Sequence, residues 1–261
     1  MRSAREDALS IVTFGWALAV LLVVLAVVAA AMTRLAGLGR ASGVLIAAVR
    51  AVVQLAAVSL VIAVVLRSLP LTALFLLLMV IVAAGTSAWR ITGSLRLSSW
   101  WTTAPIAAGL VPTMALILLS GAMPIEPIAI LPTAGILIGG AMTATSIAGR
   151  RVSEELTAQR GSYEAALSIG LSRRDGVTLV AREAAALALI PGLDQTRTVG
   201  LVTLPGAFVG VLLAGASPLQ AGAVQLLVLL ALLLVQVLAV GVTIELISAG
   251  RLPVGAGPLP E

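Results

Sequence analysis

Apolar residues run along this chain in long blocks that short polar stretches separate. Seven blocks are long enough to be helical membrane spans: residues 11–32, 43–66, 70–89, 103–120, 128–149, 198–215 and 222–247. About 20 apolar residues in a helix cross the roughly 30 Å of hydrocarbon in a bilayer. The alternating segments of about ten residues that mark a membrane β-barrel are absent. The pattern therefore predicts an all-α, polytopic transmembrane helical bundle of about seven spans, forming one domain over residues 1–261.

One polar segment interrupts this series, from Arg150 to Arg197. Thirteen of the chain's 27 charged residues fall within these 48 positions. A segment this polar between two membrane-length apolar blocks belongs outside the lipid, because charged groups are costly in hydrocarbon. We predict that residues 150–197 form the contact region for a soluble partner, between spans five and six. The Gly- and Pro-rich residues 250–261 are predicted to be a disordered tail.

The distribution of arginine predicts the orientation of the spans. Loops on one side of the predicted membrane hold twelve arginines and loops on the other side hold three, while Arg50 lies within a span. Short loops rich in arginine stay in the cytoplasm. The N-terminus is therefore predicted to be outside, and the polar region and the C-terminus inside. This arrangement predicts a multi-pass protein of the inner or plasma membrane.

The composition excludes several kinds of chemistry. The chain has no cysteine and no histidine, and all sixteen basic residues are arginine. Thiolate and imidazole chemistry are therefore excluded, and a Walker A loop is impossible without its lysine. We predict no enzyme activity and no cofactor in this chain. The net charge of +5 is attributed to membrane topology, and no nucleic-acid partner is expected.

Local signals predict two helices in the polar region. Ser162 is predicted to cap a short first helix, and Gly170 is placed to end it. Ser172 and Asp175 form a capping pair that opens a second helix, which Pro191 is predicted to stop.

The first of these helices carries one apolar face. Tyr163, Leu167, Gly170 and Leu171 recur at helical spacing and point in one direction. This face either lies on the membrane surface or enters a groove on a soluble partner. Two turns are marginal as an isolated helix and bury little area in a bilayer, which favours docking.

Four stretches of the chain resemble a known family. Residues 163–174 read YEAALSIGLSRR and residues 188–206 read ALIPGLDQTRTVGLVTLPG, with RAVVQL at 50–55 and LPTAGILIG at 131–139. They resemble the FetB-like iron-export permeases of ABC transporters, a family that includes plant aluminium-tolerance permeases. Two departures are the missing Asn beside Met142 and the missing Ile-x-Leu-Pro end of the importer loop signature. The second departure argues against a classical importer.

The resemblance implies the membrane-spanning permease subunit of an ABC exporter of iron or another metal species. A separate ATP-binding subunit would bind and hydrolyse ATP, and the permease would pair as a homodimer in the lipid membrane. The first polar helix would couple the two subunits. The residues carried over to this role are Tyr163, Glu164, Ala165, Ala166, Leu167, Gly170, Arg173 and Arg174.

Polar residues within the spans are candidates for a substrate path. They are Arg50, Gln54, Met142, Thr143, Thr145 and Glu245. Arg50 and Glu245 lie near the inner ends of their spans, where they either pair to close the bundle or form the substrate entrance. Pro205 and Gly206 are predicted to kink span six as a hinge, and Asp194 to cap the start of that span. The residues indicate no set of metal ligands, so the metal site stays unknown.

Two other classes of function also fit the sequence. An ion-coupled secondary transporter would need carboxylates inside the membrane and paired inverted repeats. Carboxylates are scarce in the predicted spans, and seven spans do not divide into two equal halves. A regulatory membrane scaffold is the other alternative, and the sequence does not exclude it.

Overall fold

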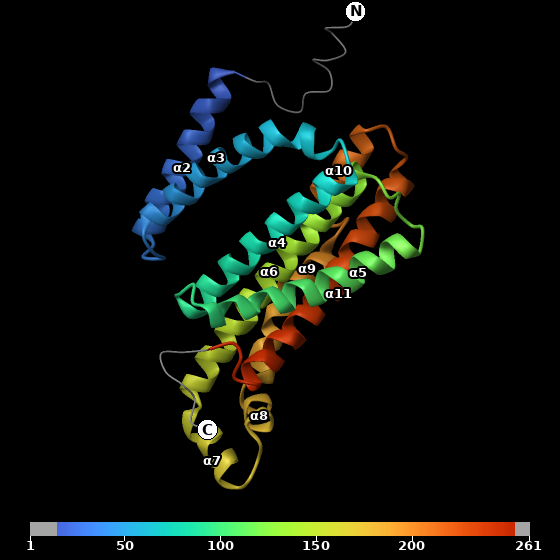
Figure 1. The fold of residues 1–261 in the computed structure, drawn as a ribbon. Coiled ribbons are helices and arrows are strands. Elements are labelled where there is room, and N and C mark those ends of the chain that lie inside the picture. Colours follow the sequence, from blue (N-terminus) through green and yellow to red (C-terminus); the bar gives the residue numbers. More distant parts are fainter. Residues whose placement is uncertain (1–14, 254–261) are drawn as a thin grey trace, which may run out of the picture. The chain divides into compact units, whose positions relative to one another are not determined.

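The computed structural model describes residues 15–253, and this part of the chain is almost entirely helical (Figure 1). Its helices are α2 (Trp16–Leu35), α3 (Ala41–Val65), α4 (Leu69–Thr92), η1 (Leu97–Thr102), α5 (Thr103–Leu119), α6 (Pro127–Ala158), α7 (Arg160–Ser168), α8 (Arg173–Ala186), η2 (Leu187–Leu189), α9 (Ile190–Thr198), α10 (Gly206–Leu213) and α11 (Pro218–Ser248). Seven helical segments in the described range are long and apolar enough to cross a membrane. The predicted all-α, multi-pass class is confirmed. Residues 11–14 of the first predicted span and residues 254–261 of the predicted tail lie outside the described residues.

The chain forms two compact units, one up to Arg67 and one from Ser68 onward. The first unit contains α2 and α3, which pack on each other as a helical hairpin. Most apolar side chains of both helices are exposed. This is expected for helices that are apolar all round and lie in a membrane.

Helices α6 and α11 form the centre of the second unit. Both pack against α5 and α8, and α6 also packs against α4. Small residues let these helices approach closely. A Cβ atom on Gly109 of α5 would lie 2.7 Å from the carbonyl oxygen of Val235 on α11. Close packing at small residues is typical of helices in membranes.

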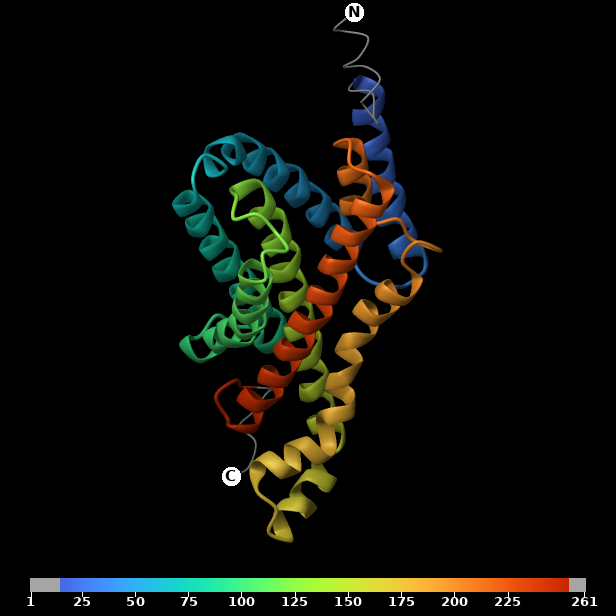
Figure 2. The same cartoon turned by 90° about the vertical axis from the view of Figure 1, so that its right-hand side faces the viewer.

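The long helices of the second unit run roughly side by side (Figures 1 and 2). Helices α4, α6 and α11 run towards the end that carries α7, and α5 and α8 run back from it. Helix α6 has 32 residues, which is about 48 Å of helix and exceeds the hydrocarbon thickness. Its charged final turns, which include Arg150 and Arg151, therefore extend beyond the lipid.

The sixth crossing differs from the single helix predicted over residues 198–215, and that prediction is wrong. Residues 199–205 leave the helical conformation, and α10 has only eight residues, or about 12 Å of helix. The segment that is long and apolar enough to cross a membrane here is instead α8, η2 and α9, 26 residues from Arg173 to Thr198. Gly200 has a φ of +82° and Pro205 an extended backbone. Both interrupt a helix that the apolar composition alone would allow.

Pro191 also differs from its predicted role, since it does not stop the second polar helix. It lies in the first turn of α9, where its missing N–H leaves no hydrogen bond unmade. The helical path therefore continues, and Asp194 lies inside α9 and does not cap a later span. The connection between α6 and α8 shrinks from the predicted 150–197 to residues 159–172.

Candidate functional site

The connection between α6 and α8 is a short helix followed by a tight turn. The backbone of Gln159 breaks α6, and α7 begins directly after it, so the predicted cap at Ser162 is wrong. Gly170 has a φ of +89°, a conformation that favours glycine, and it ends the helix as predicted. Ser172 caps α8 as predicted, because its Oγ accepts a hydrogen bond from the N–H of Asp175 at 3.2 Å.

Tyr163 lies inside the protein and not on an outward face of α7. Its side chain is fully buried, and its ring lies 3.1 Å from the position that a Cβ atom on Gly176 would occupy. Its hydroxyl has no hydrogen-bond partner among the described residues. The apolar face of α7 therefore packs on α8 of the same chain. The prediction that Tyr163 enters a groove on a partner is wrong, because the lack of a side chain at Gly176 makes room for the ring.

The exposed part of this connection is the end of α7 and the turn after it. Glu164, Ala165 and Gly170 are exposed, whereas Ala166 is buried and Leu167 is half-buried. Ile169 is 81% exposed and is the most prominent apolar side chain of the turn. Ile169 was not among the predicted site residues, although its position directly before the helix-ending glycine is visible in the sequence.

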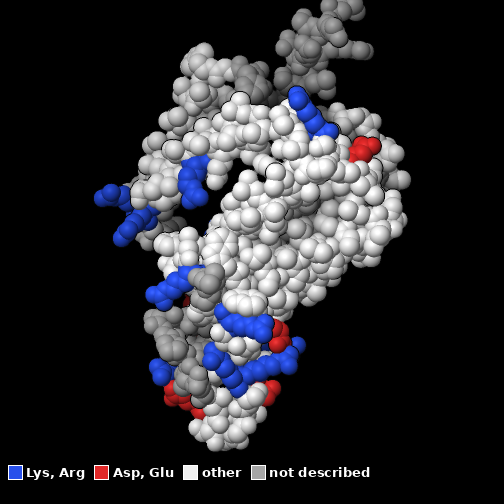
Figure 3. Space-filling model, viewed as in Figure 1, with Lys and Arg blue, Asp and Glu red and all other residues white. Residues whose placement is uncertain are grey.

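Charged side chains surround this turn. Figure 3 shows basic and acidic side chains gathered at the end of the second unit that carries α7, below a band without charge. Arg160 and Glu164 form an exposed ion pair at 2.8 Å, and Arg151 pairs with Glu154 at 3.3 Å. Exposed pairs of this kind contribute little to stability, so their main effect is to shape the surface charge.

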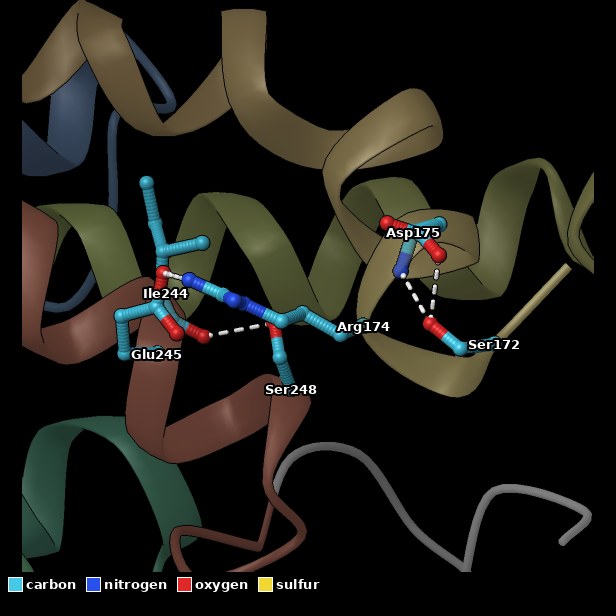
Figure 4. A network of polar contacts seen from close by, with 6 residues as sticks. All are labelled: Ser172, Arg174, Asp175, Ile244, Glu245 and Ser248. Carbon is cyan, nitrogen blue, oxygen red and sulfur yellow. Dashed lines mark hydrogen bonds and ion pairs between the residues drawn. The ribbon is translucent and has the colours of Figure 1, made fainter.

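Arg174 contacts the last turns of α11, and Arg173 lies beside Gly250, just after that helix. Arg174 donates from Nη2 to Oε1 of Glu245 at 2.7 Å (Figure 4). The guanidinium carbon of Arg173 lies 3.4 Å from the position of a Cβ atom on Gly250. The two arginines that were predicted to meet a partner thus hold α8 against its own chain. Glu245, predicted to pair with Arg50, has Arg174 as its partner within the second unit.

The residues that follow α11 fold back onto the second unit. Leu252 is 1% exposed, and the guanidinium of Arg251 lies over the ring of Trp101 at 5.0 Å from its centroid. Cation–π contacts of this kind favour Arg over an aromatic face. The prediction that the disordered tail starts at Gly250 is therefore wrong for residues 250–253, and the rest of that tail lies outside the described residues.

The predicted path residues are divided between the two units and differ in exposure. On α6, Thr143 is exposed, Met142 is half-buried and Thr145 is buried. The carbonyl oxygen of Met142 accepts hydrogen bonds from Ser87 and Ser146, which joins α4 to α6. Arg50 and Gln54 are exposed on α3, in the other unit. In residues 15–253, no group of three or more acidic side chains lies close enough together to hold a metal ion.

The predicted hinge at Pro205 and Gly206 lies at the start of α10. Pro205 precedes the helix and Gly206 is its first residue. It does not kink a continuous helix, because residues 199–205 are not helical. Instead, Pro205 and Phe208 line a cavity of about 210 Å³ together with Gln225 and Leu229 of α11.

Residues 15–250 match the family described as "Uncharacterised protein family (UPF0014)". The chain belongs to the UPF0014 family. This match covers nearly all of the described helices, and therefore includes α7, the turn at Gly170 and the break between α9 and α10.

Several proteins of known name are similar to this UPF0014 chain. "UPF0014 membrane protein STAR2" of Oryza sativa subsp. japonica is 40% identical over 124 residues, which is 48% of this chain and 44% of the relative. "Protein ALUMINUM SENSITIVE 3" of Arabidopsis thaliana is 37% identical over 48% of this chain and 45% of its own length. "Probable iron export permease protein FetB" of Escherichia coli K12 is 32% identical over 49% of each chain.

The aligned part thus spans about half the length of these relatives. The predicted resemblance to this family is confirmed, and the chain is a multi-pass membrane protein of the UPF0014 family. No solved structure matches the chain.

Proposed function

We propose that this UPF0014 protein is the permease subunit of an ABC exporter, and that a separate subunit binds and hydrolyses ATP. The observation that carries the proposal is the turn between α6 and α8. It projects from the charged end of the second unit and presents Ile169, which is 81% exposed. An exposed apolar side chain on a rigid, charged projection is suited to insertion into a groove on a soluble partner.

The helices on either side of the turn, α7 and α8, pack against other parts of the same chain. Tyr163 packs on Gly176, and Arg174 joins the start of α8 to Glu245 of α11. The helix that carries the turn is therefore connected to α11 through α8. This is the mechanical link that a transporter driven by a separate ATPase requires.

The proposed substrate is iron or another metal species, which agrees with the printed name of the bacterial relative, a probable iron export permease. The proposed assembly contains two copies of the permease, and each copy provides one such turn to the ATP-binding partner. A secondary transporter is less well supported, because the acidic side chains of the described range lie mainly at the ends of the helices. ATP is the only cofactor of the proposed assembly, and it is bound by the partner.

The test is purification of the tagged protein from native membranes, with identification of the chains that co-purify. An ATP-binding subunit is expected with the wild type, and Ile169→Asp is expected to lose it. Ile125→Asp is the matched control, because Ile125 is 62% exposed in the turn at the opposite end of the second unit. If the wild type brings no ATPase, or if Ile169→Asp retains it fully, the proposal fails. ATPase assays of the purified complex with metal salts then test the substrate.

A further inference from the structure

The short helix η1 is folded against the last turns of α4. The hydroxyl of Thr102 donates to the carbonyl oxygen of Ala84 at 2.9 Å, and the hydroxyls of Thr92 and Ser99 lie 3.1 Å apart. Helix α4 and the segment from Ser99 to Leu119 are both long and apolar enough to cross a membrane. The end of one such segment is therefore fixed beside the start of the next.

The residues that follow α11 reach the same place. Arg251 comes shortly after the end of this helix at Ser248, and its guanidinium carbon lies 5.0 Å from the centroid of the Trp101 ring. The next residue, Leu252, is buried. Helix α11 is also long and apolar enough to cross a membrane. Three span ends thus meet at η1, and the ends of spans lie at the level of the lipid headgroups.

Three of the four tryptophans of the chain lie at these span ends. Trp89 is in the last turn of α4, and Trp100 and Trp101 are in η1. They are 60%, 37% and 43% exposed. Tryptophan is enriched where a membrane meets water, because its ring is apolar and its N–H is a hydrogen-bond donor. Three exposed rings together indicate a surface that faces lipid headgroups.

Three arginines without a carboxylate partner accompany the tryptophans. Arg90 is in the last turn of α4, Arg96 directly precedes η1, and both are exposed, as is Arg251. Among the residues that the structure describes, no Asp or Glu forms an ion pair with any of the three. The sequence holds no acidic residue between Asp7 and Glu126. This surface therefore carries positive charge that no described side chain neutralises.

The position and chemistry of Arg251 suit the binding of a phosphate group. A guanidinium over an aromatic ring keeps its N–H donors, which lie in the guanidinium plane, and a phosphate accepts two of them at once. The surface is at the end of the second unit that carries α7, towards which α4 and α11 both run. The distribution of arginine predicts that this end is cytoplasmic, and the cytoplasmic leaflet carries anionic lipids.

We propose that Trp89, Arg90, Arg96, Trp101 and Arg251 form a binding site for the headgroup of an anionic phospholipid. The arginines bind the phosphate, and the tryptophan rings lie along the glycerol and the upper part of the acyl chains. The bound lipid joins the end of α11 to η1 and to the end of α4. This inference goes beyond the proposed transport function and requires neither ATP nor a protein partner.

The first test measures lipid binding by native mass spectrometry of the protein in a neutral detergent. The wild type is expected to bind phosphatidylglycerol at least about tenfold more tightly than phosphatidylcholine. Arg251→Gln should weaken the binding of phosphatidylglycerol by roughly fivefold. Arg251→Lys keeps the charge and should weaken it less, because the ammonium group still attracts phosphate without the guanidinium fork.

Arg160→Gln is the matched control for this test. Arg160 is an exposed arginine of α7 that pairs with Glu164, so its loss should leave the affinity for phosphatidylglycerol unchanged. Equal affinity of the wild type for the two lipids would overturn the proposal. So would unchanged binding in Arg251→Gln, or a loss in Arg160→Gln as large as the loss in Arg251→Gln, because binding would then follow total charge alone.

The second test places the lipid by quenching of tryptophan fluorescence. Trp16→Phe removes the one tryptophan outside this surface, so the remaining emission comes from η1 and the end of α4. In phosphatidylcholine nanodiscs, phosphatidylglycerol with brominated acyl chains should quench this variant more strongly than brominated phosphatidylcholine at the same mole fraction. Replacing Arg90, Arg96 and Arg251 together by Gln should remove the difference, and the protein should still fold because all three side chains are exposed. Equal quenching by the two lipids in Trp16→Phe, or a difference that survives the arginine replacements, would overturn the proposal.

Discussion

Arg174, at the start of α8, donates a hydrogen bond of 2.7 Å to Glu245, near the end of α11. Seventy-one positions separate the two residues in the sequence, and their contact joins the start of α8, just after the turn at Gly170, to the 31-residue apolar helix α11. Ser248 adds to the local order, because its hydroxyl donates to the carbonyl oxygen of Ile244 at 2.8 Å (Figure 4). The end of α11 that carries Glu245 is therefore joined to the start of α8.

Reversing one charge of this pair should loosen the joint without unfolding the protein. We expect Arg174→Glu or Glu245→Arg to speed amide hydrogen exchange in the first turn of α8 and the last turn of α11. The melting temperature should change little, because both side chains are more than half exposed and solvent screens the pair. Hydrogen exchange with mass spectrometry resolves the two segments.

The double reversal, Arg174→Glu with Glu245→Arg, should restore slow exchange in both segments. The matched control is Arg50→Glu with Glu245→Arg, which tests the pair predicted from the sequence. If slow exchange returned with the Arg50 double variant and not with the Arg174 double variant, the partner of Glu245 would be Arg50 of the first unit.

Tyr163 should behave as a core residue and not as a docking residue. Tyr163→Ala is expected to destabilise the protein by about 3–5 kcal/mol, the usual cost of truncating a buried aromatic side chain. Tyr163→Phe should be neutral or slightly stabilising, because the buried hydroxyl has no partner among the described residues. Thermal unfolding in detergent measures both effects. A large loss in Tyr163→Phe would reveal a hydrogen bond that the structure does not contain.

Gly176 offers a reciprocal check of the same contact. Gly176→Val should destabilise the protein by about 1–3 kcal/mol, because its side chain would overlap the Tyr163 ring. Combining it with Tyr163→Leu should recover part of the loss. Gly161→Val on α7 is the control, since a Cβ atom there meets nothing within 4 Å. Additive losses in the double variant would show that the two residues do not share a packing site.

The sequence predicted the class of fold well, because the length and apolarity of a span depend on composition alone. It also predicted the stop at Gly170 and the cap at Ser172, which depend on local backbone geometry. It failed at the sixth crossing, where apolar composition suggested a helix. Gly200 and Pro205 decide the backbone there, and their effect outweighs hydrophobicity.

The site was harder to predict than the fold. A helical stripe such as Tyr163 and Leu167 shows that one face is apolar, but not whether that face packs on the same chain or on another protein. The glycine that decides this, Gly176, lies thirteen positions further along the sequence. The packing of α9 on α11 likewise depends on the tertiary contact between Gly192 and Gln236, which no local pattern indicates.

The orientation of the bundle stays a prediction, and single cysteines can test it. Ile169→Cys and Ile125→Cys place exposed thiols at opposite ends of the second unit. The arginine excess around α7 predicts that Ile125→Cys reacts with an impermeant reagent in intact cells. Ile169→Cys should react only after the membrane is permeabilised. The reverse result would show the opposite orientation in the membrane. Labelling of both cysteines in intact cells would contradict a single crossing between Ile125 and Ile169.

The contact between Gly192 and Gln236 should be selective for a glycine. A Cβ atom on Gly192 would overlap the amide oxygen of Gln236, so Gly192→Ala forces this buried side chain to a new rotamer. We expect a loss of about 1–3 kcal/mol, as for other overpacked cores. Gln236→Ala should cost less than usual for its size, because its amide oxygen has no hydrogen-bond partner among the described residues. In Gly192→Ala with Gln236→Ala, the new methyl group has room and the stability should recover, which a double-mutant cycle of thermal unfolding measures. Gly241→Ala on α11 is the control and should not be destabilising, since a Cβ atom there meets nothing within 4 Å. A cycle without coupling would contradict the contact between α9 and α11 at this point.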